Sequence, residues 1–225
     1  MVLLLMGYMS SGWLARKLRR PVQMKSIAEI ERRAFCGTLP TVELQRRLYA
    51  KQRVGWWSVP LTAVYLSHFV VPYACAAWLH RHDRARWRRW NAEFALVSAA
   101  GLVMYVVVPS APPWMASAEG MIEPVVRTSG DGLELRGLER VKRLLDFGQE
   151  NSNTVAAVPS IHAAHSLLVP LLFWEEASPT LRTFSALYPI AMGATLVATA
   201  EHYVVDVGLG FAFTLAAHAV TKRMA

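Results

Sequence analysis

Two groups of polar residues interrupt the apolar stretches in the second half of the chain. The first is VPSIHAAHS, with Ser160, His162 and His165, and the second is ATAEHYVVDVGLG, with His202 and Asp206. Ionisable side chains are costly inside apolar, membrane-spanning helices, so their presence indicates a functional site. His202 and Asp206 are spaced i, i+4, which places them on one face of a helix. A carboxylate beside an imidazole fixes the tautomer of the ring and raises its basicity.

These residue types suit reactions at phosphorus. An imidazole held by a carboxylate can attack phosphorus and form a covalent phosphohistidine. A second histidine nearby, His162, can protonate the leaving oxygen. Pro159 and Ser160 are typical of a helix start, with Ser160 as its cap. Because the first turn of a helix presents free backbone N–H groups, this start also suits an anionic phosphate.

Membrane topology brings the two polar groups to the same side. His162 lies near the start of one predicted crossing, the chain turns at residues 175–182, and His202 lies where the next crossing ends. Both histidines are therefore expected to face the same side of the membrane. Counting residues leaves a difference in depth of about one or two helical turns.

A metal site is an alternative interpretation of the same side chains. The histidines of both polar groups could bind one ion together with Asp206. The chain has seven histidines in all, two of them in a basic segment away from both groups, and we expect no metal and no cofactor. His165 either supports the site or packs beside it, and Glu201 is either a surface residue or part of the site. His68 and His218 are expected to be packing residues.

The composition decides which elements can position these residues. Hydrophobic residues make up 54 % of the 225 residues, charged residues make up 18 %, and the apolar residues come in long blocks. This excludes a disordered or fibrous protein and disfavours a water-soluble globule. One membrane crossing uses about 20 apolar residues, so about six crossings fit, without room for a soluble domain. The predicted fold is all-α: an integral membrane bundle of about six transmembrane helices with amphipathic helices lying on the membrane surface.

The order of apolar and polar stretches predicts two regions. Residues 1–53 contain a short membrane helix (1–14) and an interfacial amphipathic region, and residues 54–225 form the catalytic membrane domain. The proline-rich stretch from Pro109 to Trp114 ends one crossing sharply, because proline cannot continue a helix. The crossings predicted in the second region are 54–79, 94–108, 155–174, 183–201 and 203–220.

The segments between the crossings are basic. Residues 80–92 are expected to form a tight loop whose arginines lie at the lipid headgroups. In the longest loop, 115–154, a predicted helix places Leu138, Leu144 and neighbouring apolar residues on one side, which we expect to rest on the bilayer. The net charge of +8 is interpreted as contact with anionic lipids and not with nucleic acid.

Several motifs resemble those of a known family. PSIH at 159–162 resembles the PSGH-type second motif of the type-2 phosphatidate phosphatase superfamily, and HYVVD at 202–206 resembles the HxxxD core of its third motif. The PSAPPW and EHYVVDVGLG stretches resemble the branch of inositol phosphorylceramide and sphingomyelin synthases. The resemblance covers roughly residues 50–220. It implies a six-helix membrane enzyme that moves phosphate groups on lipids without a metal. By motif position it implies His202 as nucleophile, Asp206 as its orienting carboxylate and His162 as general acid.

The sequence departs from this family at its basic residues. The first motif of the family is Lys, six residues and Arg-Pro, whereas this chain has Tyr105, six residues and Pro112-Pro113. The Ser-Arg that usually opens the third motif is Thr195-Leu196 here. A phosphate still needs cationic partners, and the long loop offers several. Arg127 is the preferred candidate, with Arg136, Arg140, Lys142 and Arg143 as the others.

The sequence therefore predicts a lipid phosphatase or headgroup phosphotransferase that acts on a phospholipid or polyprenyl phosphate, in the manner of an inositol phosphorylceramide synthase. Ser160, Arg127, His165 and Tyr105 are expected to bind the substrate phosphate. The missing basic residues leave an alternative, a non-catalytic membrane binding or scaffold protein on the same fold.

The side of the membrane is less directly encoded. Stretches on the side of the site carry 16 Lys and Arg residues and those on the other side carry 8, which by itself favours a cytoplasmic site. The family resembled usually works on the outer face. Following the family, we expect an integral cell-membrane protein with an extracytoplasmic active site.

Overall fold

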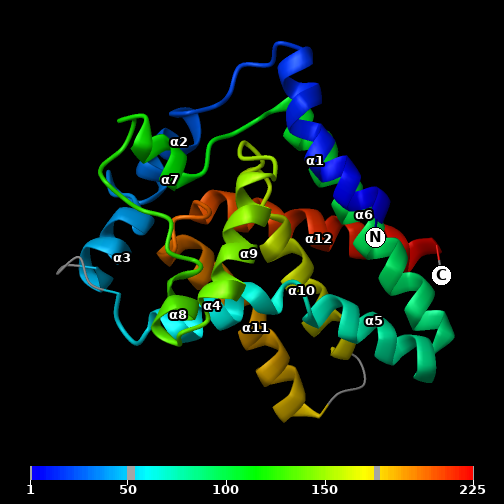
Figure 1. The fold of residues 1–225 in the computed structure, drawn as a ribbon. Coiled ribbons are helices and arrows are strands. Elements are labelled where there is room, and N and C mark those ends of the chain that lie inside the picture. Colours follow the sequence, from blue (N-terminus) through cyan, green and yellow to red (C-terminus); the bar gives the residue numbers. More distant parts are fainter. Residues whose placement is uncertain (1, 50–53, 175–177, 225) are drawn as a thin grey trace.

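The computed structural model describes residues 2–49, 54–174 and 178–224, and their regular secondary structure is helical (Figure 1). This confirms the predicted all-α fold. The helices are α1 (Val2–Lys17), α2 (Ser26–Ala34), α3 (Pro40–Leu48), α4 (Ser58–Ser67), α5 (Val71–His82), α6 (Arg84–Val107), α7 (Pro113–Ala118), α8 (Asp131–Leu135), α9 (Glu139–Glu150), α10 (Ile161–Phe173), α11 (Pro179–Ala198) and α12 (Val204–Met224).

Long apolar helices make up the membrane part of the fold. Within the described residues, α6, α11 and α12 have the length and composition to cross a bilayer. Helices α4 and α5 together make a fourth candidate, bent by 43° at the short break between them. The six crossings predicted from the sequence also include α1 and α10, which have 16 and 13 residues and fall short of a full crossing.

Helix α10 packs at the centre of the bundle, against α6, α11 and α12. Its close approach to α12 requires a glycine, because a Cβ on Gly210 would lie 2.3 Å from the carbonyl oxygen of Ser160. One turn further along, the Thr214 hydroxyl donates a hydrogen bond to the Ala164 carbonyl across the same contact (2.8 Å). The two polar groups of the sequence therefore lie on neighbouring helices.

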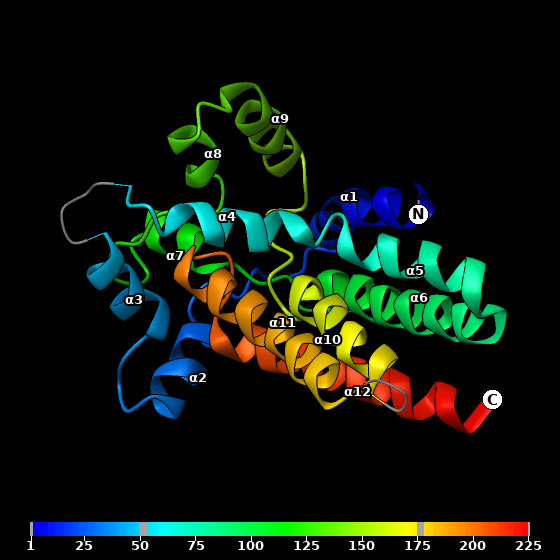
Figure 2. The same ribbon diagram turned by 90° about the horizontal axis from the view of Figure 1, so that it is seen from below.

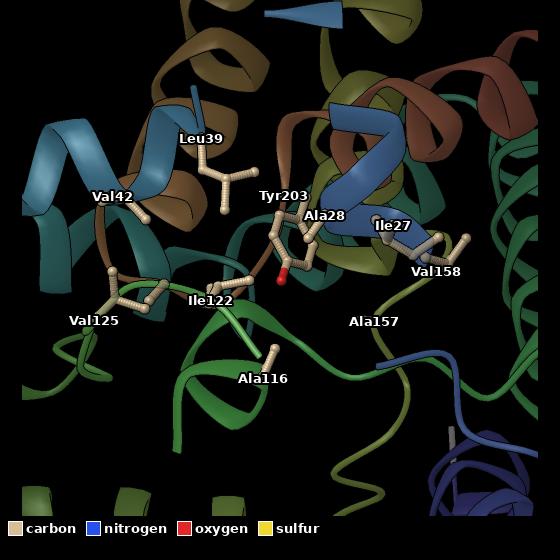
Figure 3. Close-up of a cluster of buried hydrophobic side chains, with 11 residues drawn as sticks. Ile27, Ala28, Leu39, Val42, Ala116, Ile122, Val125, Ala157, Val158 and Tyr203 are labelled. Atoms are coloured by element: carbon tan, nitrogen blue, oxygen red, sulfur yellow. The ribbon is translucent and has the colours of Figure 1, made fainter. Parts of the chain in front are cut away.

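The N-terminal helices α2 and α3 pack against the end of the bundle that carries the second polar group. Ile27 and Ala28 of α2 are buried in one hydrophobic cluster with Tyr203 and with residues of α3 and α7 (Figure 3). The Thr41 hydroxyl of α3 donates to the carbonyl of Val197 in the last turn of α11 (2.7 Å). The amphipathic pattern of this region thus reflects contact with protein.

The basic segment 80–92 is not a loop, contrary to the prediction. Helix α5 continues to His82 and α6 begins at Arg84, so Asp83 alone separates them. The Asp83 carboxylate caps α6 by accepting a hydrogen bond from the Arg86 N–H (2.9 Å). Asp83 alone connects the two helices, so the arginines of this segment belong to α5 and α6 and lie on helix surfaces.

The amphipathic helix predicted in the longest loop consists of two helices. Helices α8 and α9 are separated at Gly137, which has a positive φ of 66°. Figure 2 shows the pair as a unit that projects from the bundle beside α4. Leu144 of α9 is 72 % exposed, and no described residue of α9 is buried.

Candidate active site

The start of α10 and the turn before α12 hold each other directly. The Ser160 hydroxyl accepts a hydrogen bond from the Ala163 N–H and caps α10, as the sequence predicts (3.3 Å). The Ser160 N–H donates to the backbone carbonyl of Asp206 (3.0 Å). This link fixes the PSIH segment against the HYVVD segment.

His202 and Asp206 are both buried at this junction. Nδ1 of His202 lies 3.4 Å from Oδ2 of Asp206, somewhat longer than a hydrogen bond, and such contacts in active sites often tighten in the substrate complex. The same Oδ2 accepts a hydrogen bond from the Tyr203 N–H (2.9 Å), which holds the carboxylate against the turn. His202 lies in the turn before α12 and not on a helix as predicted, and it is this turn that places the acid beside Nδ1 of the imidazole.

The two histidines singled out in the sequence lie next to each other. The ring centroids of His162 and His202 are 6.0 Å apart. The other face of His162 stacks on Tyr65 of α4 (5.2 Å between centroids), and His68 lies 4.2 Å from it. An imidazole from α10 and one from the turn before α12 therefore share one site, with neighbouring rings that fix the position of His162.

A charged network borders His202. Nε and Nη2 of Arg127 donate to the two carboxylate oxygens of Glu201 (2.8 and 2.9 Å). Oε1 of Glu201 also accepts from the Ser129 hydroxyl, and the guanidinium lies over the ring of Trp114, 5.2 Å from its centroid. Burial acts to lower the pKa of Arg127, but the carboxylate of Glu201 outweighs it and the pKa is raised. Arg127 is therefore a permanent cation within the site.

A large cavity joins these groups to an apolar surface. It has a volume of about 810 Å³, and its polar end is lined by His162, His202, Arg127 and Glu201. The rest of its lining comes mainly from apolar side chains of α4, the α4–α5 break, α6 and α9, which include Leu66, Phe69, Phe94, Leu102, Val141, Leu144, Leu145 and Phe147. The cavity is thus amphipathic, as is a lipid with a phosphate headgroup.

The remaining predicted site residues take supporting positions. His165 lines the cavity, stacks on Phe94 and shares a hydrogen bond between its Nε2 and the Ser98 hydroxyl (3.0 Å). The Tyr105 hydroxyl, at the cavity wall, donates to the carbonyl of Pro159 (2.9 Å). The hydroxyls of Tyr105 and Ser160 thus already bind the backbone around the start of α10.

The match to a family model decides which proteins this chain is related to. A model described as the PAP2 superfamily matches residues 27–220. The chain belongs to the PAP2 superfamily. The matched segment begins at residue 27, within α2, so the match to the superfamily includes nearly all of α2 and the whole of α3. No solved structure matches the chain.

One curated protein resembles this PAP2 chain in sequence. Phosphoinositol dihydroceramide synthase of Bacteroides thetaiotaomicron is 30 % identical over 158 residues, which cover 67 % of the chain and 51 % of the relative. The chain thus spans about half the length of this relative. The match supports the synthase-like branch of the superfamily and the broader class of membrane lipid phosphatases and phosphotransferases.

The long loop contributes a basic side chain to the cavity of this PAP2 chain. Arg127 is the basic residue of that loop that lines the cavity in the described part of the chain. Lys142, another predicted candidate, pairs with Asp146 on α9 (2.9 Å). Arg136, Arg140 and Arg143 are placed around α9 and are not among the cavity-lining residues.

Two residues of the site were missed in the sequence. His68 was expected to pack in the core, but it lines the cavity at the break between α4 and α5 and contacts His162. The available signal was its position as the one histidine in the apolar run 54–79. Gln149 of α9 donates to the Tyr65 and Ser129 hydroxyls (3.1 Å each), and nothing in its sequence context indicated this.

The metal alternative can be compared with the geometry of the described residues. Among them, no three His, Cys, Asp or Glu side chains are arranged to hold a metal ion. The four histidines that line the cavity lie against one another or against aromatic rings, with ring centroids 3.9 to 6.0 Å apart.

Proposed function

We propose that this protein is a membrane lipid phosphotransferase that works through a phosphohistidine on His202, with hydrolysis as the same reaction when water is the acceptor. The observation that carries the proposal is the pairing of His202 with His162 at the polar end of an amphipathic cavity of about 810 Å³. Membership of the PAP2 superfamily supports the same class of reaction.

In the first step, Nε2 of His202 attacks the phosphorus of the donor lipid. Nδ1 faces Asp206, so the carboxylate stabilises the positive charge that develops on the ring. The P–N bond forms as the bond from phosphorus to the leaving oxygen breaks, and protonated His162 gives its proton to that oxygen. The product alcohol leaves, and His162 is neutral.

In the second step, an acceptor hydroxyl attacks the phosphohistidine. Neutral His162 takes the proton of the hydroxyl as the new P–O bond forms and the P–N bond breaks. Both histidines return to their starting states, so no net proton is consumed in transfer. The same balance holds for water, in which case inorganic or headgroup phosphate is released.

Arg127 is proposed to bind the phosphate in place of the basic residues that this chain lacks. Its contacts with Glu201 use Nε and Nη2, which leaves Nη1 for a phosphate oxygen. The carboxylate holds the guanidinium plane in place, and a fixed fork suits a phosphate better than a flexible cation does. Ser160 and Tyr105 are proposed to contribute by shaping the start of α10, and His165 by holding the cavity wall.

The apolar part of the cavity is proposed to bind the acyl chains of the donor. Its walls include Phe69 of the α4–α5 break and Leu144 and Phe147 of α9. The relative is named for phosphoinositol and dihydroceramide, so a phosphoinositol lipid as donor and a ceramide-type alcohol as acceptor are the first pair to test. Phosphatidate and polyprenyl phosphates are the competing donors.

The decisive experiment is a substrate screen on the purified protein in mixed micelles that contain chelator. Each lipid phosphate is supplied with and without inositol or a ceramide-type acceptor, and both free phosphate and new lipid are measured. We expect turnover that His202→Ala abolishes and His80→Ala, a change at an exposed histidine of α5, leaves intact. Unchanged turnover in His202→Ala would rule out the proposed mechanism, and turnover that requires added metal would rule out metal independence.

The active site is proposed to face the extracytoplasmic side. Single cysteines at Ala85, beside the α5–α6 junction, and at Ala118, at the end of α7, lie on exposed positions at opposite ends of the bundle. After replacement of Cys36 and Cys75 by serine, an impermeant thiol reagent on intact cells should label position 118 only. Labelling of position 85 only would place the site in the cytoplasm.

A non-catalytic binding role remains the second candidate, because this chain lacks the Lys and both Arg residues of the family motifs. A His162→Ala, His202→Ala double variant separates the two candidates. Biological activity in this variant equal to that of the wild type would favour the binding role, and loss of activity supports the enzyme.

A further inference from the structure

A carboxylate that belongs to none of the family motifs is buried beside the catalytic turn. Glu31 of α2 is 0 % exposed. Its Oε2 accepts a hydrogen bond from the N–H of Val205 in the first turn of α12 (3.1 Å), whereas Oε1 has no partner among the described residues. A buried carboxylate is costly unless it is hydrogen-bonded, so its presence on an amphipathic helix calls for a function.

Two carboxylates hold the turn between His202 and Asp206, and each accepts a hydrogen bond from a different backbone N–H of that turn. Asp206 accepts from the Tyr203 N–H (2.9 Å), and Glu31 accepts from the Val205 N–H (3.1 Å). From this arrangement we infer that Glu31 is a positioning residue, which holds the first turn of α12 so that Asp206 stays directed at Nδ1 of His202. The inference rests on the function proposed above, in which Asp206 orients the nucleophile.

The physical reason lies in the unpaired amides at the start of a helix. The first turn of α12 presents N–H groups that need acceptors, and Asp206 lies on this same turn. Without Glu31, the Val205 N–H would lose its acceptor in a part-buried position. Any shift of Asp206 toward that donor lengthens its contact with His202, which is already 3.4 Å.

Packing makes α2 a rigid support for this carboxylate. Ile27 and Ala28, on the buried face of the same helix, belong with Tyr203 to one hydrophobic cluster (Figure 3). On its outer side, α2 is tied by the ion pair of Arg32 with Glu123 (2.5 Å). The position of Glu31 relative to the catalytic turn is therefore fixed on both faces of its helix.

The charge of Glu31 changes in the physiological pH range. Burial raises its pKa to about 7, backbone N–H donors of the turn lower it, and the nearby Asp206 raises it. Tyr203 faces it from the turn, and Arg32, on its own helix, is engaged by Glu123. Because the ionised form is the stronger acceptor for the Val205 N–H, positioning should be best above neutral pH.

The test compares Glu31→Gln with Glu29→Gln, an exposed residue of the same helix. Transfer or hydrolysis by the full-length protein in mixed micelles is measured as kcat and KM from pH 5.5 to 9, per folded protein. For Glu31→Gln we expect kcat at pH 8 to fall about tenfold or more, as when an orienting partner is lost. KM should remain unchanged, and the rise of kcat around pH 7 should disappear. Glu29→Gln should match the wild type in kcat, KM and pH profile.

Two results would overturn the inference, and they can be told apart. If Glu31→Gln keeps the wild-type kcat and pH profile while His202→Ala is inactive, Glu31 has no positioning role and the proposed function stands. If His202→Ala is active, the proposed function itself fails and the inference fails with it. Should Glu31→Gln not fold, Glu31→Asp, with a shorter side chain of the same charge, must show the loss of kcat with unchanged KM.

Discussion

The two ends of the bundle contain the same three residue types in different arrangements. At the end away from the site, Glu93 of α6 binds Arg89 (2.9 Å), His218 (3.1 Å) and the Thr221 hydroxyl (2.7 Å) through Oε1. The cavity beside this cluster holds only about 50 Å³. At the site end, Arg127 and Glu201 pair with each other and leave His202 to face a cavity of about 810 Å³. Where an Arg, a Glu and a His bind one another, they join two helices. The same residue types beside a large cavity can act on a substrate.

The largest expected difference between the two ends is in the histidines. His202→Ala should lower turnover by about a thousandfold or more, because the proposed nucleophile is lost. His218→Ala should leave turnover per folded protein within about twofold and reduce the free energy of unfolding by about 1–2 kcal/mol, since Glu93 loses one donor. Turnover assays and thermal unfolding in the same detergent measure both effects. Equal losses of turnover in the two variants would contradict the different roles assigned to His202 and His218.

The arginines should differ by a smaller factor. Arg127→Lys keeps the charge but loses the two-point contact with Glu201, and we expect kcat/KM to fall about 10- to 100-fold. Arg89→Lys, at the other end, should leave kcat/KM near the wild-type value. Steady-state kinetics with the best donor lipid test this pair. Wild-type kcat/KM in Arg127→Lys would show that this guanidinium does not bind the phosphate.

Two buried glutamates differ in their hydrogen bonds, and Glu31 predicts a pH dependence of stability. Glu93 has three partners, whereas Oε1 of Glu31 is unpaired and the pKa of Glu31 is raised from 4.5 to about 7. Between these values the folded state holds a proton that the unfolded state has released, so raising the pH destabilises the fold, by up to about 3 kcal/mol above pH 7. Glu31→Gln should remove this decline.

Thermal unfolding of the wild type and of Glu31→Gln at pH 5, 6, 7 and 8 checks this prediction. The Tm of the variant should rise relative to that of the wild type as the pH rises, although its kcat at pH 8 is lower than that of the wild type. A variant that is less stable than the wild type at pH 8 would contradict the assigned cost of the buried charge.

The smallest effect is expected at the apolar wall of the large cavity. Leu144 and Leu138 are both exposed, but of the two only Leu144 lines the cavity. Leu144→Ser should raise KM for a long-chain donor about three- to fivefold, because the apolar contact with an acyl chain is lost, and Leu138→Ser should not. A short-chain donor should show no difference. Equal KM values for all three proteins with the long-chain donor would indicate that the acyl chains bind elsewhere.

Part of this site could be read from the sequence, because it depends on local spacing and on the order of the helices. The i, i+4 relation of His202 and Asp206, and the return of the chain through α10 and α11, are sufficient to bring His162 and His202 to the same end. The cap at Ser160 is equally local, and the structure shows it. The side of the membrane is the same for all five basic residues of the long loop, and of these Arg127, the preferred candidate, lines the cavity.

The rest depends on tertiary packing that a pattern does not contain. The break at His68 turns its ring toward His162, although the run 54–79 looks like one straight crossing. An amphipathic pattern such as that of α2 and α3 is the same whether the apolar face meets a membrane or a protein. The pattern therefore does not distinguish Glu31 from an exposed charged residue. The length of the α5–α6 link was misjudged because a basic segment is compatible with both a loop and a helix surface.

The most direct measurement of the central claim is the isolation of the covalent intermediate. The purified protein is mixed with a donor lipid labelled with ³²P, quenched within the first turnover and digested under alkaline conditions, which preserve phosphohistidine. The account predicts an acid-labile, base-stable label on the peptide that contains His202. A label on another residue, or steady turnover with no labelled peptide at any quench time, would contradict it.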